Sequence, residues 1–279
     1  MKFVFIADFF VDQVLGGGEI NNEEFINILR EKGHEIHAVN SQLVTLRLLS
    51  EYKDYNFIVA NFVRLSEETK RYLLDKKYVI YEHDHKYLTT RNPSDFKNYL
   101  APKEAIINYD FYKSAISVFC QTSFHKNIVE KNLNLDNIAS LGGNLWSTEY
   151  LDLLEEMSKV EKTDTCAIIN SPVPHKNTSE AILYCNTMNM DYNLIDFENP
   201  IGFLKALGLC KTLVFFPKTP ETLSRVVVEA RMMGMGTKTT QNIGALHETW
   251  FSEKGSDLIG LMRNKREEIP KIVVSCFAG

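Results

Sequence analysis

The fold is indicated most clearly by the stretch that opens the chain, residues 1–40, MKFVFIADFFVDQVLGGGEINNEEFINILREKGHEIHAVN. Residues 3–7 are a short apolar run, the pattern of a buried strand. A loop with consecutive glycines follows, and residues 19–32 then carry apolar side chains at helical spacing until Gly33 ends the helix. Residues 36–39 form a second apolar run. A strand, a helix and a strand in this order predict one unit of a parallel sheet.

The same alternation continues along the chain and is interrupted once. Further strands are expected at 57–60, 78–81, 117–120, 166–170, 192–195 and 213–216, with helix-like segments between them. The interruption is the sequence LGGN at 141–144, followed by a charged stretch at 151–164. We therefore predict an α/β protein with two Rossmann-like, doubly wound parallel-sheet domains, residues 1–150 and 151–279. Such sheets bind ligands at the carboxyl ends of their strands, here in the cleft between the domains.

Composition excludes several classes of protein. The 279 residues include 31 Lys and Arg against 36 Asp and Glu, a net charge of −5, so no overall positive field attracts nucleic acid. No apolar run approaches the ~20 residues of a membrane-spanning helix, and the apolar start is too short for a secretory signal. The five cysteines lack paired spacing, which favours free thiols in a reducing compartment over disulfides or zinc. We expect a cytoplasmic protein.

The most informative segment for function joins an expected strand to an expected helix, FPKTPETLSRVVVEA at 216–230. The first backbone amides of this helix are expected at Thr222, Leu223 and Ser224. Such amides attract an anion. Glu221 and Glu229 lie eight residues apart. That is at most ~12 Å along a helix axis, a span that suits the two ends of a nucleotide diphosphate sugar. An amphipathic helix with an acidic first turn is the alternative explanation.

Two other strand ends carry polar groups. The loop at 169–177 includes Lys176, a point charge for a leaving diphosphate, although most loop lysines are simply solvated. In the segment YVIYEHDHKYL at 78–88, strand alternation would place His83 and His85 on one face and Asp84 on the other. One histidine and the aspartate could orient or polarise a sugar and its acceptor, or the segment could be only a polar strand end. No third ligand has suitable spacing, so we expect no metal.

The glycine-rich loop before the first helix offers a further binding element. Consecutive glycines such as Gly17 and Gly18 allow a backbone to approach a phosphate or a sugar closely, and a flexible turn is the alternative. The glycines lack the G-x-G-x-x-G spacing, and no acidic residue ends the second strand. This argues against a dinucleotide cofactor and NAD-dependent chemistry.

Taken together, these segments resemble the retaining glycosyltransferases of the two-domain GT-B architecture over nearly the whole chain. The matching motifs are Gly17-Gly18-Glu19, the "rGHeV"-like Arg30-Glu31-Lys32-Gly33-His34-Glu35-Ile36, His83-Asp84, the E-x7-E pair Glu221 and Glu229, and Gly244-Ala245-Leu246-His247-Glu248. The phage DNA α-glucosyltransferases are also similar in the His-Asp-His segment. Each motif is short, and their shared order gives the resemblance its weight.

The resemblance implies roles for these residues. Glu221 would hold the donor sugar, Glu229 the ribose, Lys176 the diphosphate, and His83 would contact the sugar near the reacting carbon. The donor would be a nucleotide sugar such as a UDP-sugar, the sugar configuration would be retained, and neither a metal nor another cofactor would be needed. The family's arginine before the loop lysine is missing, and Arg225 or Lys218 is the candidate substitute. No long helix that crosses back to the first domain is obvious at the C-terminal end.

The acceptor stays open at this level. A glycan or another small hydroxyl compound is one expectation. A hydroxymethylated DNA base is another. Residues 86–103 contain one acidic residue, Asp95, and four basic residues that could face DNA phosphates: Lys86, Arg91, Lys97 and Lys103. An epimerase that acts on a sugar nucleotide and a binding module without catalysis are the alternatives from other classes.

Overall fold

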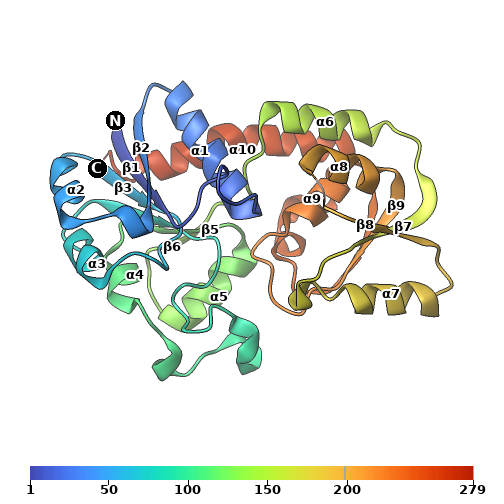
Figure 1. Cartoon of the computed structure of the whole chain (residues 1–279), viewed down its shortest axis with the longest axis horizontal. Helices are drawn as coiled ribbons and strands as arrows, with labels where there is room; N and C mark the ends of the chain where they lie inside the picture. The colour runs from blue at the N-terminus through green and yellow to red at the C-terminus, as the bar shows by residue number, and fades with distance from the viewer. Residues whose placement is uncertain (198, 279) are drawn as a thin grey trace. The chain divides into compact units, whose positions relative to one another are not determined.

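The computed structural model describes residues 1–197 and 199–278 (Figure 1). The chain divides into two compact units. The first contains Met1–Trp146 together with the residues from Lys265 onward, and the second contains Ser147–Asn264. Each unit is an α/β structure with its own parallel sheet, as the sequence predicts.

The first unit is built on a sheet that has six strands within the described residues, in the order β2-β1-β3-β4-β5-β6. All neighbouring strands are parallel. The strands are β1 (Lys2–Ala7), β2 (Glu35–Asn40), β3 (Asn56–Val59), β4 (Tyr78–Tyr81), β5 (Val118–Cys120) and β6 (Ile138–Ser140). The helices are α1 (Gly17–Glu31), α2 (Leu46–Glu51), α3 (Glu67–Leu73), α4 (Tyr109–Ser114) and α5 (Ser123–Leu133). Short 3-10 helices lie at Ser41–Leu43, Pro93–Asp95, Lys97–Tyr99 and Lys103–Ala105.

Both faces of this sheet are buried, which explains its continuous apolar strands. Val4 and Ile6 of β1 point into one hydrophobic cluster, and Phe3 and Phe5 point into another. Successive side chains of a strand alternate between faces, so a strand covered on both sides must be apolar at every position. The strands predicted at 3–7, 36–39, 57–60, 78–81 and 117–120 are therefore confirmed within one or two residues.

The second unit has a smaller sheet, with four strands within the described residues in the order β10-β9-β7-β8, all parallel. The strands are β7 (Thr163–Ile169), β8 (Tyr192–Ile195), β9 (Cys210–Phe215) and β10 (Gly236–Thr239). The helices are α6 (Thr148–Ser158), α7 (Thr178–Thr187), α8 (Pro200–Gly208), α9 (Arg225–Met232) and α10 (Gly255–Ser275). Short 3-10 helices lie at Pro174–Lys176, Gly244–His247 and Thr249–Ser252.

The C-terminal helix differs from the sequence-based expectation. α10 begins in the second unit, and its residues from Lys265 onward belong to the first unit. Ile269, Val273 and Phe277 are buried in the first unit's cluster with Phe3 and Phe5. The range 151–279 expected for the second domain is therefore too long at its end, because these apolar side chains complete the first unit's core. A long helix does pass from the second unit to the first.

None of the helices in residues 1–197 and 199–278 combines the length and the hydropathy that a bilayer crossing requires. The expected cytoplasmic location stays a prediction.

Candidate functional site

The second unit holds Glu221 in a fixed backbone position. The Glu221 N–H donates to the Asn242 carbonyl at 2.7 Å, and the Gly244 N–H donates to the Glu221 carbonyl at 2.8 Å. Glu221 and Ile243 thereby form an isolated parallel bridge beyond the sheet. The segment 244–248 is thus placed directly beside the loop that carries Glu221.

Lys176 and Glu221 come together at the ends of two neighbouring strands. Lys176 follows β7, Glu221 follows β9, and Lys176 Nζ lies 2.8 Å from Glu221 Oε1. The two loops are tied by the Lys218 N–H, which donates to the His175 carbonyl at 2.9 Å, and by Asn177 Nδ2, which donates to the Phe216 carbonyl at 3.0 Å. The Lys176 side chain is one-third exposed. The pair is rigidly held yet still reachable by a ligand.

The helix after Glu221, which the sequence predicts from about Leu223, starts two residues later. α9 begins at Arg225, so Thr222, Leu223 and Ser224 precede it and are not its first amides. Ser224 caps the helix with a left-handed backbone (φ 74°), a conformation that L-residues other than Asn and Asp rarely adopt. Its buried Oγ has no hydrogen-bond partner among the described residues. Because Glu221 lies outside the helix, the ~12 Å estimate of its axial separation from Glu229 does not apply.

Glu229 is buried inside a small polar cluster on α9. Its Oε1 lies 3.5 Å from Arg225 Nε, one helical turn earlier. Tyr150 of α6 also hydrogen-bonds to Glu229, and burial together with this carboxylate raises the pKa of the Tyr150 hydroxyl. Arg225, one candidate for the family's missing arginine, is therefore engaged with Glu229. Tyr150 is not among the predicted site residues, since nothing in the sequence places α6 against α9.

In the first unit, His83 is held by two amide side chains. Gln121 Nε2 lies 2.6 Å from His83 Nδ1, and His83 Nε2 lies 2.6 Å from Asn22 Oδ1. Because an amide NH2 can only donate, Nδ1 accepts and Nε2 carries the proton. Burial and the nearby Lys86 lower the pKa of His83 to about 3, so the ring is neutral. The buried Asn22 Nδ2 has no hydrogen-bond partner in the described part of the chain, which leaves a donor beside the ring.

Asp84, whose side chain is 38% exposed, belongs to an ion cluster around the buried Lys86 and Glu82. Lys86 Nζ lies 2.6 Å from Glu82 Oε1 and 2.5 Å from Asp84 Oδ1, and Tyr112 donates its hydroxyl proton to Glu82. Burial raises the pKa of Glu82 to about 7, with the Asp84 charge adding and Lys86 opposing. Burial also opposes ionisation of Asp84, yet Lys86 outweighs it and lowers the pKa of Asp84. Asp84 is therefore an anion, positioned by a buried lysine.

The strand alternation expected for this segment is wrong. β4 ends at Tyr81, so His83, Asp84 and His85 lie beyond the strand and do not alternate between its faces. His85 packs instead edge-on against His125, with ring centroids 5.0 Å apart. His83 is the histidine that lies near the helix α1.

The glycines before α1 are part of that helix. α1 begins at Gly17, and a β-carbon added at Gly18 would lie 3.6 Å from the His83 ring. This is an ordinary van der Waals distance, so the first turn of α1 lies beside His83 and the contact does not itself require a glycine. Gly17, the first residue of the helix, is exposed.

No cluster of three or more His, Cys, Asp or Glu side chains in residues 1–197 and 199–278 is arranged for a metal ion. Three polar residues that hold the predicted residues in place were not themselves predicted as part of the site: Asn22, Gln121 and Tyr112. They reach His83 and Glu82 from α1, from the end of β5 and from α4. Their positions in the sequence carry no signal of this contact.

Comparisons with known proteins relate the chain to others by its fold. No family model matches the sequence, and no curated protein matches it. The structure of the Anabaena protein Alr3699/HepE in complex with UDP aligns with a TM-score of 0.58 and 12% identity over 100% of this chain and 90% of that chain. HepE with UDP-glucose aligns at 0.53 and 12%, over 99% and 95%. An alpha-glucosyltransferase in complex with UDP and a 13-mer DNA with a central A:G mismatch aligns at 0.52 and 10%, over 96% and 90%. The chain therefore has the fold of GT-B glycosyltransferase structures, with two parallel-sheet α/β domains.

Proposed function

We propose that the chain is a retaining glycosyltransferase, which moves a sugar from a UDP-sugar to a hydroxyl group without a divalent metal. The fold supports this class of reaction, since HepE was solved with UDP and with UDP-glucose. The observation that carries the proposal is the contact of 2.8 Å between Lys176 and Glu221 in front of the first turn of α9. Cation, carboxylate and helix start are the groups that a sugar diphosphate requires together.

Each of these groups has a role in the proposed donor complex. Lys176 would exchange Glu221 for the diphosphate, and backbone N–H groups of α9 would donate to the same phosphates. Glu221, released from the lysine, would accept hydrogen bonds from sugar hydroxyls. Glu229, buried next to Arg225, would accept from the ribose. In the transfer step the bond from the anomeric carbon to the phosphate oxygen breaks, and the acceptor oxygen bonds to that carbon from the same face. The acceptor proton leaves with the diphosphate.

His83 would act in this reaction as a neutral group. Both of its ring nitrogens are already hydrogen-bonded, to Gln121 and to Asn22. We therefore propose that His83 shapes the sugar-binding surface, and that the unpartnered Asn22 Nδ2 donates to an oxygen of the bound substrate. Asp84 would face the acceptor as a fixed anion.

A hydroxymethylated DNA base is the second candidate acceptor. The alpha-glucosyltransferase solved with DNA has a similar fold, and Arg91, Lys97 and Lys103 are exposed. Lys86, the fourth basic residue counted in the sequence, is buried with Glu82 and is not available to phosphates. Three exposed cations are a weaker basic surface than the sequence suggests.

The test is calorimetric titration of the full chain with UDP and UDP-sugars, followed by transfer assays. Glu221→Gln and Lys176→Gln are expected to weaken UDP-sugar binding about ten-fold or more, since each removes a charged hydrogen-bonding group. Glu161→Gln, an exposed loop carboxylate of the same unit, is the matched control.

Nuclear magnetic resonance of the product would give the anomeric configuration, which retention requires to match the donor. Isomerisation of the donor without any acceptor would favour an epimerase instead, and transfer to a hydroxymethylated oligonucleotide alone would favour the DNA acceptor. Absence of binding to every nucleotide sugar and to UDP would refute the proposal.

A further inference from the structure

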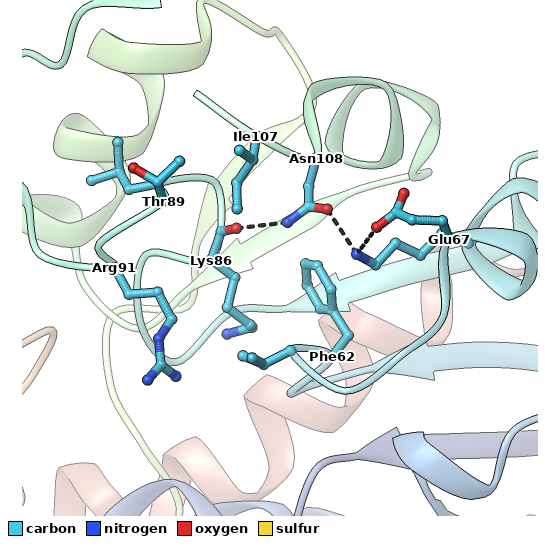
Figure 2. Close-up of a pocket in the computed structure, with 10 residues that line it drawn as sticks. Phe62, Glu67, Lys86, Thr89, Arg91, Ile107 and Asn108 are labelled. Atoms are coloured by element: carbon cyan, nitrogen blue, oxygen red, sulfur yellow. Dashed lines mark hydrogen bonds and ion pairs between the residues drawn. The ribbon is translucent and has the colours of Figure 1, made fainter. Parts of the chain in front are cut away.

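The first unit contains a cavity of about 460 Å³ beyond the carboxyl ends of β3 and β4. Figure 2 shows it lined by side chains from three segments of the chain. The residues that matter here are Phe62, Lys70, Lys86, Arg91, Ile107 and Asn108. Its volume lies in the range of sites for small molecules, about 300–1,000 Å³. The residues assigned to the donor sugar and its diphosphate do not line it.

One wall of the cavity is built around a buried lysine. Lys70 Nζ lies 2.7 Å from Glu67 Oε1 and 2.9 Å from Asn108 Oδ1, and the lysine side chain is 10% exposed. Asn108 Nδ2 donates in turn to the Lys86 carbonyl at 2.8 Å (Figure 2). The wall is thus cross-linked by hydrogen bonds and does not need a ligand to form.

The opposite side of the cavity presents an arginine with spare donors. The Arg91 side chain is 52% exposed, and its guanidinium is paired within residues 1–197 and 199–278 only with Asp84, NH1 to Oδ2 at 3.5 Å. A guanidinium has five N–H donors in a planar fork that matches a carboxylate or a phosphate. The left-handed backbone at Arg91 (φ 54°) holds it in a tight turn. Most of its donor capacity is open to a ligand.

The balance of charge and apolar surface indicates the ligand chemistry. Lys70, Lys86 and Arg91 line the cavity together with a single carboxylate, Glu67. The remaining lining is apolar or neutral, and it includes Phe62, Val63, Leu88 and Ile107. Lys70 is paired with Glu67, and Lys86 is buried against Glu82 and Asp84, so among the described residues Arg91 is the lining cation with donors open to a ligand. An exposed guanidinium beside an apolar lining favours an anion that also has a less polar face. A neutral sugar would add no negative charge beside the guanidinium, whose contact with Asp84 is long at 3.5 Å.

The cavity is connected to the residues assigned to catalysis. Asp84 contacts both Lys86, at 2.5 Å, and Arg91, and it directly follows His83 in the chain. We propose that this cavity binds the acceptor of the transfer, and that the acceptor is a small hydroxyl compound with an anionic group, such as a sugar acid or a sugar phosphate. Arg91 pairs with the anion, and the acceptor hydroxyl points toward Asp84. The identification of the ligand as an acceptor rests on the proposed function.

The test compares three sugars that differ in one substituent: glucose, glucuronate and glucose 6-phosphate. Titration into the full chain, followed by nuclear magnetic resonance, is expected to show one acidic sugar binding about ten-fold more tightly than glucose. The glucuronate and phosphate arms separate the two sources of the anion. Arg91→Gln is expected to remove the preference, whereas Lys97→Gln, the same change at an exposed lysine outside the cavity, retains it. The preference is also expected to shrink at high salt.

Three outcomes would overturn the assignment. They are equal affinity for all three sugars, an acidic-sugar preference that survives in Arg91→Gln, and Arg91-dependent binding of a hydroxymethylated oligonucleotide but of neither acidic sugar. Thermal unfolding of Arg91→Gln checks that the variant folds, and its exposed side chain makes a small effect the expectation. UDP binding is measured in parallel. If UDP does not bind but the Arg91-dependent preference is present, the transferase proposal fails and the anion site stands.

Discussion

Buried Glu82 is expected to make the first unit less stable as the pH rises. Its pKa is raised from 4.5 to about 7, chiefly by burial, so the folded chain holds this proton more tightly than the unfolded chain does. The stabilisation by the proton is complete below the unfolded pKa and is lost as the pH rises from about 4.5 through 7. At about 1.4 kcal/mol for each pKa unit, the loss is about 3 kcal/mol.

Glu82→Gln isolates this effect. Glutamine has nearly the shape of protonated glutamate and does not titrate, so the variant should not show the loss. The unfolding free energy of the variant minus that of the wild type is expected to increase by about 3 kcal/mol between pH ~4.5 and ~8. Titrating groups that do not interact with Glu82 are common to both proteins and cancel in this difference.

Urea unfolding, followed by the fluorescence of Trp146, measures this difference in unfolding free energy. Trp146 is buried in the first unit and Trp250 belongs to the second, so a Trp250→Phe background leaves one reporter for the unit that contains Glu82. Glu104→Gln, the same change at an exposed carboxylate in the same unit, is the matched control variant. A constant difference for Glu82→Gln, within about 1 kcal/mol, would refute the reasoning from burial.

Three further predictions concern other parts of the chain. Ser224→Gly is expected to be more stable than Ser224→Ala by about 1 kcal/mol in thermal unfolding, because glycine accepts φ 74° without strain; equal stability would contradict this. Ile269→Ala should destabilise the first unit, as reported by Trp146, by about 2–5 kcal/mol, and Leu261→Ala on the same helix, more exposed, by far less. The His83 ring signal in a nuclear magnetic resonance titration should not move between pH ~5 and ~8, since its pKa is lowered to about 3, and a midpoint near 6.5 would show a solvated ring.

Local patterns were sufficient for most of the strands and for the type of fold. The apolar runs that become β1 and β4 are buried on both faces, and that environment leaves a mark on every residue of a strand. The short strands β6 and β10 lack such a run and were not identified. The predicted start of α9 was two residues too early. Ser224, just before the helix, has a left-handed backbone that usually takes a glycine, so a serine at this position does not indicate it.

The candidate site was predicted in part. The loops that bring Lys176 to Glu221 follow two strands that neighbour each other in the sheet, so their meeting follows from the expected topology. The partners of His83 are different, since Asn22 and Gln121 lie 61 and 38 residues away along the chain. Only packing brings such amides to the ring.

The sequence by itself determined that this chain alternates buried strands with helices in two series, because hydrophobic periodicity is a local property. The tertiary structure alone decided which unit the end of α10 completes, how His83 comes to be neutral, and that Lys86 is withdrawn from solvent by Glu82 and Asp84. These features depend on desolvation and on contacts between distant segments, and neither is encoded in the spacing of neighbouring residues.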